Sequence, residues 1–251
     1  MSAGGYESWF VSARDPVSPR ALWIRHTRHR PRVGPESVAL WCTLIDRDGG
    51  QQPTVVKEVL GAFPPGTAAG PGQFRGQAVM AGHHARWDLA VTGDQAPLRP
   101  LRPAALYRAP LPRTKLEAVV PDGQVTGSLE LDGRTVAVSG WRGTVGHNWG
   151  PEHADSWVWL HAAGFGAAPE SWLELVLARI RVGPARSPWT AMGGDLHRPA
   201  RRNPYRPARR TGRGRADPAP PGSARAHPDR RPRRLRVRHQ PHARDRAATA
   251  A

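Results

Sequence analysis

The chain has 251 residues, with 37 Lys and Arg against 20 Asp and Glu, which gives a formal net charge of +17. This length accommodates one or two domains, and the single cysteine, Cys42, excludes an intramolecular disulfide framework and a cysteine-rich metal site. No apolar run is long enough to span a membrane as a helix, the N-terminus lacks the pattern of a secretory signal, and we expect a cytoplasmic protein.

Alternation of apolar and polar residues, which is typical of β-strands, dominates the first 194 residues. In residues 21–27, for example, Leu22, Ile24 and His26 fall on one face. Asp132 and Gly133 predict a tight hairpin because both tolerate positive φ. The same patterns predict further strands at residues 7–11, 38–45, 54–59, 127–131, 134–138, 156–161 and 172–182.

The predicted fold class is therefore all-β. No segment shows an amphipathic helix with start and stop signals, and many short strands between Gly- and Pro-rich turns indicate a sandwich or a barrel. Closure into an antiparallel barrel would remove exposed edges, and small barrels often hold one apolar ligand. Residues 64–72 and 97–112 are rich in Pro and are predicted to be surface loops.

The densest group of polar and aromatic residues lies at positions 140–161, where three His, one Asn, one Glu, one Asp and four Trp occur. In the predicted strand, Trp157, Trp159 and His161 share one face and would offer two indoles and an imidazole to a bound molecule. The functional hypothesis makes His147, Glu152 or His153 a proton donor or acceptor beside aromatic walls. The alternative makes the tryptophans core residues and the histidines satisfied polar groups at a strand end.

A metal site is the weaker hypothesis for these histidines. His147, His153 and His161 could converge, with the pair at 83–84 nearby, but their spacing matches no zinc-enzyme pattern. Nucleotide-binding glycine fingerprints and a Gly-x-Ser-x-Gly nucleophile elbow are also absent from the sequence. We therefore expect no metal and no cofactor.

Residues 195–251 differ from the rest, with 17 Arg, four acids and no Lys, a net charge of +13. They hold too few large apolar side chains to offset the entropy of ordering, so we expect a disordered basic tail. Three hypotheses remain open: a basic arm that binds nucleic acid through phosphates, a solvated extension, or the product of a shifted reading frame in a GC-rich gene. A nucleic-acid partner is expected only if this tail is genuine.

Three places carry a family resemblance: residues 6–11, residues 86–89, and residues 143–150 followed by Trp157-Val158-Trp159. In these places the sequence resembles the lipocalin-like proteins that include carotenoid hydratases (hydroxyneurosporene synthase), tocopherol cyclase and AttH-type proteins. The resemblance covers about residues 5–194. It implies a first lipocalin-like β-barrel at residues 1–140 and the start of a second at 141–194, before the tail at 195–251.

The resemblance implies acid-catalysed chemistry: protonation of an alkene, then water addition or ring closure, as in hydratases and cyclases of the lyase or isomerase type. In the hydratases an acidic residue directly precedes the His-Asn pair, and here that position is Gly146. We expect an apolar, isoprenoid- or polyketide-like small molecule as partner; the alternative is a non-catalytic carrier, which Gly146 favours. The candidate catalytic residues are His147, Glu152, His153 and Asp88, and the candidate ligand-binding residues are Trp87, Asn148, Trp149, Trp157, Trp159 and His161.

Overall fold

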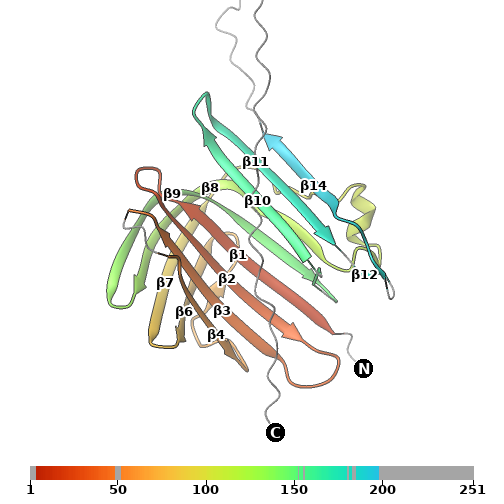
Figure 1. The fold of residues 1–251 in the computed structure, drawn as a ribbon, viewed down its shortest axis with the longest axis horizontal. Coiled ribbons are helices and arrows are strands. Elements are labelled where there is room, and N and C mark those ends of the chain that lie inside the picture. Colours follow the sequence, from red (N-terminus) through yellow and green to blue (C-terminus); the bar gives the residue numbers. More distant parts are fainter. Residues whose placement is uncertain are drawn as a thin grey trace, which may run out of the picture. The chain divides into compact units, whose positions relative to one another are not determined.

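The structure is a computed structural model that describes residues 4–48, 52–151, 153–154, 156–179, 181–182 and 185–197. All of them belong to one compact unit, Met1–Arg202, and nearly all lie in β-strands, as Figure 1 shows. The predicted all-β fold class is confirmed. The elements are β1 (Gly5–Arg14), β2 (Arg20–Arg30), β3 (Ser37–Asp46), β4 (Thr54–Leu60), β5 (Ala68–Ala69), β6 (Gln73–Met80), β7 (His83–Thr92), the 3-10 turn η1 (Ala104–Tyr107), β8 (Lys115–Leu131), β9 (Arg134–Gly150), β10 (Ser156–Phe165), β11 (Ala168–Arg179), β12 (Arg181–Val182), β13 (Ala185–Arg186) and β14 (Thr190–His197).

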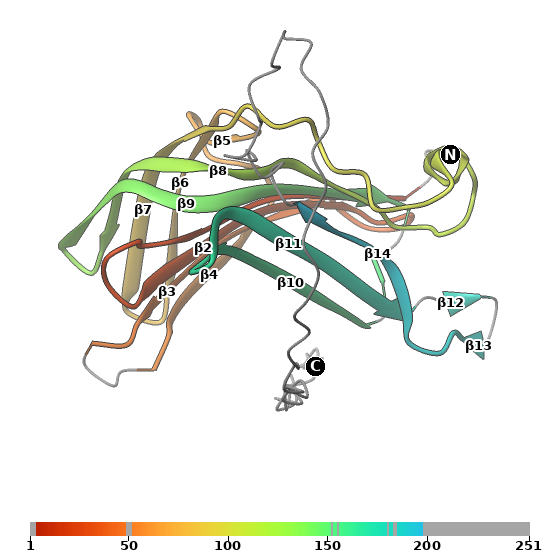
Figure 2. The same cartoon turned by 90° about the horizontal axis from the view of Figure 1, so that it is seen from above.

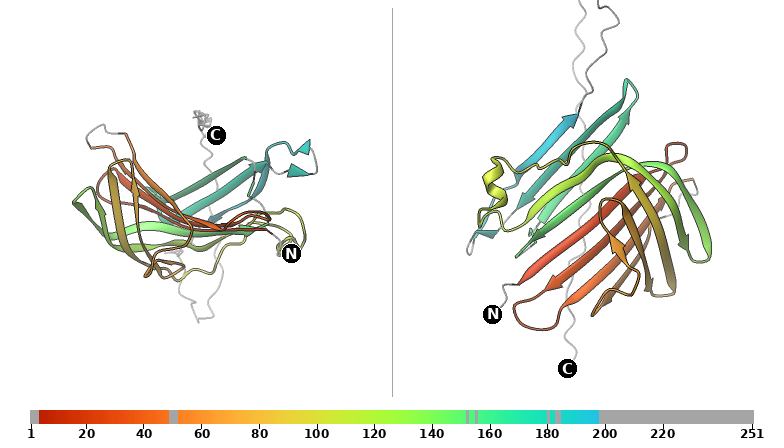
Figure 3. Two further views of the ribbon diagram at one scale, coloured as in Figure 1. Left: turned by 90° about the horizontal axis from the view of Figure 1, so that it is seen from below. Right: turned by 180° about the vertical axis from the view of Figure 1, so that it is seen from behind.

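Nine strands form one antiparallel sheet in the order β4-β3-β2-β1-β9-β8-β7-β6-β5. The sheet curls strongly, as Figure 3 shows from below, and brings its two edges together: Glu58 on β4 accepts a hydrogen bond of 3.0 Å from the backbone N–H of Val79 on β6. Among the described strands no backbone ladder joins β4 to β5 or β6. The expected barrel is thus a half-barrel, closed at this point by a side chain.

The inner face of the curl holds the main hydrophobic core, and the predicted alternation places residues there. Leu22, Ile24 and His26 of β2 are only 1%, 0% and 3% exposed. The predicted hairpin is confirmed as well, since Asp132 and Gly133 have φ of 53° and 78° between β8 and β9. Other large side chains of this core are Val11, Leu40, Phe74, Trp87, Leu89, Leu129 and Val145.

A second sheet, β10-β11-β14, packs on the opposite face of the curled sheet near β1, β8 and β9 (Figure 2). Leu116 of β8 contacts Val176 of β11, and Ala118 of β8 lies in one cluster with Trp172. β9 runs without a break to Gly150, so residues 141–150 belong to the nine-stranded sheet, and the change of sheet falls between Gly150 and Ser156. That residues 141–194 begin a second barrel stays a prediction.

The Pro-rich segment at 97–112 is not simply the surface loop that its composition predicts. Leu98 and Leu101 are 8% and 3% exposed and pack into the clusters between the two sheets. Lys115 holds the segment in place because its buried ammonium donates hydrogen bonds of 2.6, 2.9 and 2.6 Å to the carbonyls of Leu106, Ala109 and Pro112. Such charge-assisted hydrogen bonds are about twice as strong as neutral ones.

The expected tail begins at residue 195, but β14 continues to His197 and pairs Leu196 with Leu173 of β11. The rest of the tail lies outside the described residues, so its disorder, its reading frame and a nucleic-acid partner stay predictions. In the described part of the chain no helix has the length and apolarity needed to cross a membrane.

Candidate functional site

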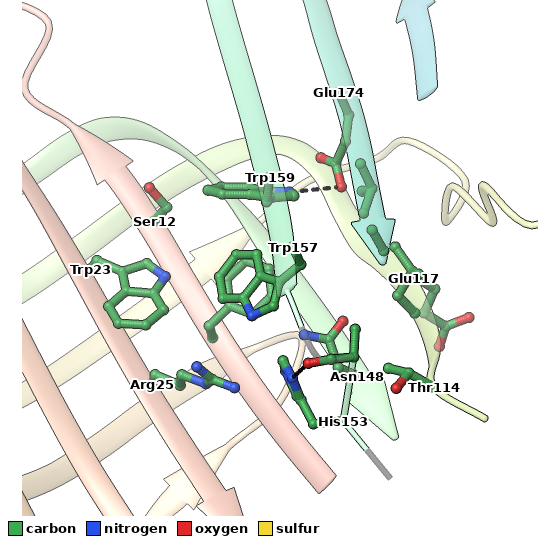
Figure 4. A pocket seen from close by; sticks show the side chains of 15 residues that line it. Ser12, Trp23, Arg25, Thr114, Glu117, Asn148, His153, Trp157, Trp159 and Glu174 are labelled. Atoms are coloured by element: carbon green, nitrogen blue, oxygen red, sulfur yellow. Dashed lines mark hydrogen bonds between the residues drawn. The ribbon is translucent and has the colours of Figure 1, made fainter. Parts of the chain in front are cut away.

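A pocket of about 360 Å³ lies between the two sheets, within the range typical of small-molecule sites. β1 and β2 form one wall, β10 and β11 form the other, and β8, β9 and the segment before β10 complete it (Figure 4). The lining residues are Phe10, Ser12, Trp23, Arg25, Thr114, Leu116, Glu117, Asn148, His153, Ala154, Trp157, Trp159, Glu174, Val176 and Ala178.

Four large aromatic side chains, two from each sheet, line the pocket: Phe10, Trp23, Trp157 and Trp159. The rings of Phe10 and Trp159 meet edge to face at 5.2 Å, and Trp23 lies 6.5 Å from Phe10. Trp157 also lines the pocket but remains 41% exposed. The predicted common face is confirmed by the β10–β11 register, which sets Trp157, Trp159 and His161 opposite Ala178, Val176 and Glu174.

His153 lies at the end of the pocket near β1 and β2. Its ring contacts Tyr6 edge to face at 4.8 Å and Trp157 at 6.0 Å, and its Nδ1 is 3.0 Å from the carbonyl oxygen of Ala154. Burial lowers the pKa of His153, the Ala154 carbonyl opposes this change, and the positive charge of Arg25 lowers the pKa further. The imidazole is therefore neutral at physiological pH and suits a hydrogen-bonding role.

A buried carboxylate, Glu174, faces the pocket from β11. It is 2% exposed, and its Oε1 accepts a hydrogen bond of 3.1 Å from the indole N–H of Trp159. Its Oε2 lies 3.4 Å from Nδ1 of His161, and neither atom has a hydrogen-bond partner among the described residues. Nε2 of His161 is also buried without a hydrogen-bond partner among the described residues. The carboxyl and imidazole thus form an incompletely satisfied polar pair beside the pocket, and such buried pairs indicate a functional role.

His147 lies on the other face of the sheet, because neighbouring residues of a strand point to opposite sides. It stacks between Trp9 at 3.9 Å and Trp149 at 4.6 Å, and its Nε2 is 3.1 Å from Glu7. Burial lowers the pKa of His147, and the carboxylates of Glu7 and Glu117 oppose this change. Asn148 faces the inter-sheet pocket, whereas His147 and Trp149 line a separate surface hollow of about 330 Å³.

Gly146 is where the resembled hydratases carry an acid, and it is tightly packed here. A Cβ at this position would come closer than 3.0 Å to three ring atoms of Phe10. Phe10 itself is 8% exposed and is held by Trp159 and Trp23. The space that a side chain at residue 146 would need is therefore taken by the Phe10 ring, and the acidic residues that line the pocket are Glu117 and Glu174.

Five of the described sequence-predicted candidates do not line the inter-sheet pocket: Trp87, Asp88, His147, Trp149 and His161. Trp87 is a core residue, 1% exposed, and donates a hydrogen bond of 3.1 Å to Nε2 of His26. Asp88, which follows it in β7, points to solvent with its side chain 54% exposed and pairs with Arg75 at 2.9 Å. Glu152 lies outside the described residues.

The pocket residues that the sequence patterns did not indicate include Phe10, Arg25 and Glu174. Arg25 and Glu174 are charged residues within strands whose faces are otherwise apolar or aromatic, and both are less than 10% exposed. The alternation of Trp172, Glu174, Val176 and Ala178 already placed a carboxylate on an apolar face. That signal could have identified Glu174, because a buried charge indicates either a paired network or a function.

The predicted histidines do not meet around a common point. His147 lies on the inner face of the curled sheet, His153 in the pocket and His161 beside Glu174. Within the described ranges no group of three His, Cys, Asp or Glu side chains is placed to hold a metal ion.

Comparisons with known proteins give distant similarities. No protein-family model matches the chain. It is 29% identical over 169 residues to the uncharacterized protein Rv0493c of Mycobacterium tuberculosis strain H37Rv and to the uncharacterized protein MT0513 of strain CDC 1551, matching 64% of this chain and 50% of each relative. The chain thus spans about half the length of these curated relatives.

Among solved structures, one described as an AttH protein of Nitrosomonas europaea is similar with a TM-score of 0.48 and 16% identity, over 77% of this chain and 68% of the other. The complex of CghA with Sch210972 is similar with a TM-score of 0.44 and 14% identity, over 79% and 59%. The resemblance to carotenoid hydratases and tocopherol cyclase stays a prediction.

Proposed function

We propose that this chain binds an apolar small molecule, of isoprenoid or polyketide type, in the inter-sheet pocket. The observation that supports this best is a cavity of about 360 Å³ that combines eight aromatic and aliphatic lining residues with seven polar or charged ones. Binding sites for small molecules have this composition. Trp157 keeps 41% of its surface exposed beside the cavity, and covering such apolar surface is favourable by about 25 cal/mol per Å².

Filling the pocket is expected to weaken binding strongly. Ser12→Trp adds an indole from β1 where Ser12 lines the cavity, and Ala90→Trp adds the same group at an exposed position of β7. Calorimetric titration with decanol should give saturable binding at one molecule per chain for the original protein and for Ala90→Trp. Ser12→Trp should weaken that binding by about a hundredfold, since about 3 kcal/mol of apolar contact is lost. Equal affinity in all three proteins would contradict the pocket as the binding site.

Acid catalysis on the bound molecule is a second candidate function, and the Glu174 arrangement favours it. In this step the Glu174 carboxyl gives its proton to one carbon of an alkene, and the cation forms on the neighbouring carbon between the Trp157 and Trp159 rings. Indole faces stabilise cations. Water, or a hydroxyl of the same molecule, then adds to the cation and returns a proton to the carboxylate, so the net reaction is hydration or cyclisation.

Glu174→Gln is expected to slow this reaction by about a hundredfold or more, the usual contribution of a general acid. The chain is incubated with linear isoprenoid alkenes in deuterated water, and mass spectrometry follows incorporation of deuterium into carbon. Glu117→Gln is the matched control, since Glu117 also lines the pocket but forms an ion pair of 2.9 Å with Arg99. Decanol binding should survive both substitutions. An unchanged rate in Glu174→Gln would remove Glu174 as the acid, and no incorporation by the original chain would favour the non-catalytic carrier.

A further inference from the structure

Arg25 is a buried cation at the end of the pocket where His153 lies (Figure 4). It projects from β2 and is only 9% exposed. Its Nε donates a hydrogen bond of 2.8 Å to Ser8, and its Nη2 donates one to the hydroxyl of Tyr6. The guanidinium carbon also lies 5.7–6.0 Å from the centres of three rings, those of Tyr6, Trp23 and Trp41.

No carboxylate among the described residues pairs with this guanidinium. Of the two acidic side chains that line the pocket, Glu117 is paired with Arg99, and Glu174 is bound by Trp159 and lies beside His161. The aromatic rings and two hydroxyls compensate the charge only in part, and Nη1 makes no hydrogen bond within the described residues.

An uncompensated buried charge is costly in free energy, and most ionisable side chains avoid this cost by becoming neutral. An arginine has no such route because its guanidinium stays protonated in proteins. The neighbouring His153 does not add a second positive charge, since burial and Arg25 both lower its pKa. The pocket therefore presents one permanent cation, with an unused planar donor edge, to whatever molecule enters.

We propose that Arg25 anchors an anionic head group, a carboxylate or a similarly delocalised oxyanion, at one end of the apolar ligand. A guanidinium binds such planar anions through two parallel N–H···O bonds. This inference rests on the proposed function and adds the chemical class of the ligand.

The arrangement also orients the ligand. Figure 4 places Arg25 and Glu174 on opposite sides of Trp157. With the anion at Arg25, the apolar body would extend along Trp157 and Trp159 toward Glu174. The reactive or distal part of the molecule would thus lie at the acidic end of the pocket.

The test compares three ligands with one apolar chain: decanoate, methyl decanoate and decanol. Titrations use the full chain at high salt and at a pH well above the pKa of carboxylic acids, because salt screens its exposed arginines more than a buried one. We expect decanoate to bind at least about tenfold more tightly than the two neutral ligands. This preference is the difference expected for one buried charge-assisted pair. Arg25→Gln should remove the preference and leave the affinity for decanol within about twofold of the original.

Arg75→Gln is the matched control, because Arg75 is an exposed arginine paired with Asp88 on β7; it should keep the full preference. If decanol binds the original chain but decanoate binds no more tightly, the anionic head group is ruled out while the proposed function stands. If decanol itself fails to bind, the proposed function is overturned and this inference falls with it. The comparison of decanoate with the two neutral ligands in the original chain tests the anionic head group even if Arg25→Gln fails to fold.

Discussion

Gly146→Asp is expected to destabilise the fold by about 3 kcal/mol or more. A Cβ at residue 146 would come closer than 3.0 Å to the Phe10 ring, and that ring is held by Trp159 and Trp23. Overpacking of a tight site costs about 1–3 kcal/mol, and the carboxylate adds the cost of a buried charge. Urea unfolding followed by circular dichroism measures the loss, and Gly61→Asp, where nothing lies within 4 Å of the new Cβ, should be nearly neutral.

The double variant Phe10→Ala with Gly146→Asp shows whether the Phe10 ring is the cause. Phe10→Ala alone should cost about 3 kcal/mol through the lost packing of a buried ring. The double variant should be more stable than the sum of the two single changes by about 1–3 kcal/mol, because removing the ring frees the space that the Asp needs. Additive losses of stability would show that the Asp side chain and the Phe10 ring do not compete for one space, and would contradict the Phe10 ring as the cause of the destabilisation.

Acidification is expected to destabilise the protein through His26. Burial lowers the pKa of His26 from its ordinary 6.5 to about 4, and the side chain lies in the core, where Trp87 donates to its Nε2. The contribution of neutral His26 to the free energy of unfolding is complete above pH 6.5. It is lost as the pH falls from 6.5 toward 4, because there the unfolded chain binds a proton that the folded chain excludes. A difference of this size corresponds to about 3 kcal/mol.

The measurement is the free energy of unfolding in urea at several pH values between neutral and pH 4 for the original chain and for His26→Gln. Gln keeps an acceptor for the Trp87 indole but does not titrate. As the pH falls, the original chain should lose about 3 kcal/mol more of its free energy of unfolding than His26→Gln does. His147 and His153, whose pKa values are also lowered by burial, contribute equally to both profiles. Parallel profiles would show that His26 is not buried as a neutral ring.

Local patterns predicted the strands well, because a strand with one buried face alternates apolar and polar residues along its sequence. The positions of Leu22, Ile24 and His26 and the hairpin at Asp132-Gly133 followed from alternation and turn chemistry alone. The pocket did not follow, because it depends on which face of the curled sheet the second sheet covers. That choice brings Phe10 of β1 to Trp159 of β10, nearly 150 positions later in the chain, and no local pattern encodes it.

The candidate site shows the same limit at the scale of single residues. Alternation places Trp87 and Asp88 on opposite faces of one strand, and His147 and Asn148 on opposite faces of another. Motif-based selection grouped these neighbours by their proximity in sequence. The structure keeps Trp87, Asp88 and His147 out of the inter-sheet pocket and brings in Arg25 and Glu174, which no motif contains.

The most direct test of the central claim is a crystal structure of the chain with bound ω-bromodecanoate, whose bromine is located by anomalous scattering. The account predicts the alkyl chain between the two sheets, in contact with Phe10 and Trp159, with its carboxylate at Arg25 and its bromine toward Glu174. A ligand found instead in the mouth of the curled sheet beside Trp9 and His26, where a smaller hollow of about 230 Å³ exists, would contradict the inter-sheet pocket as the binding site.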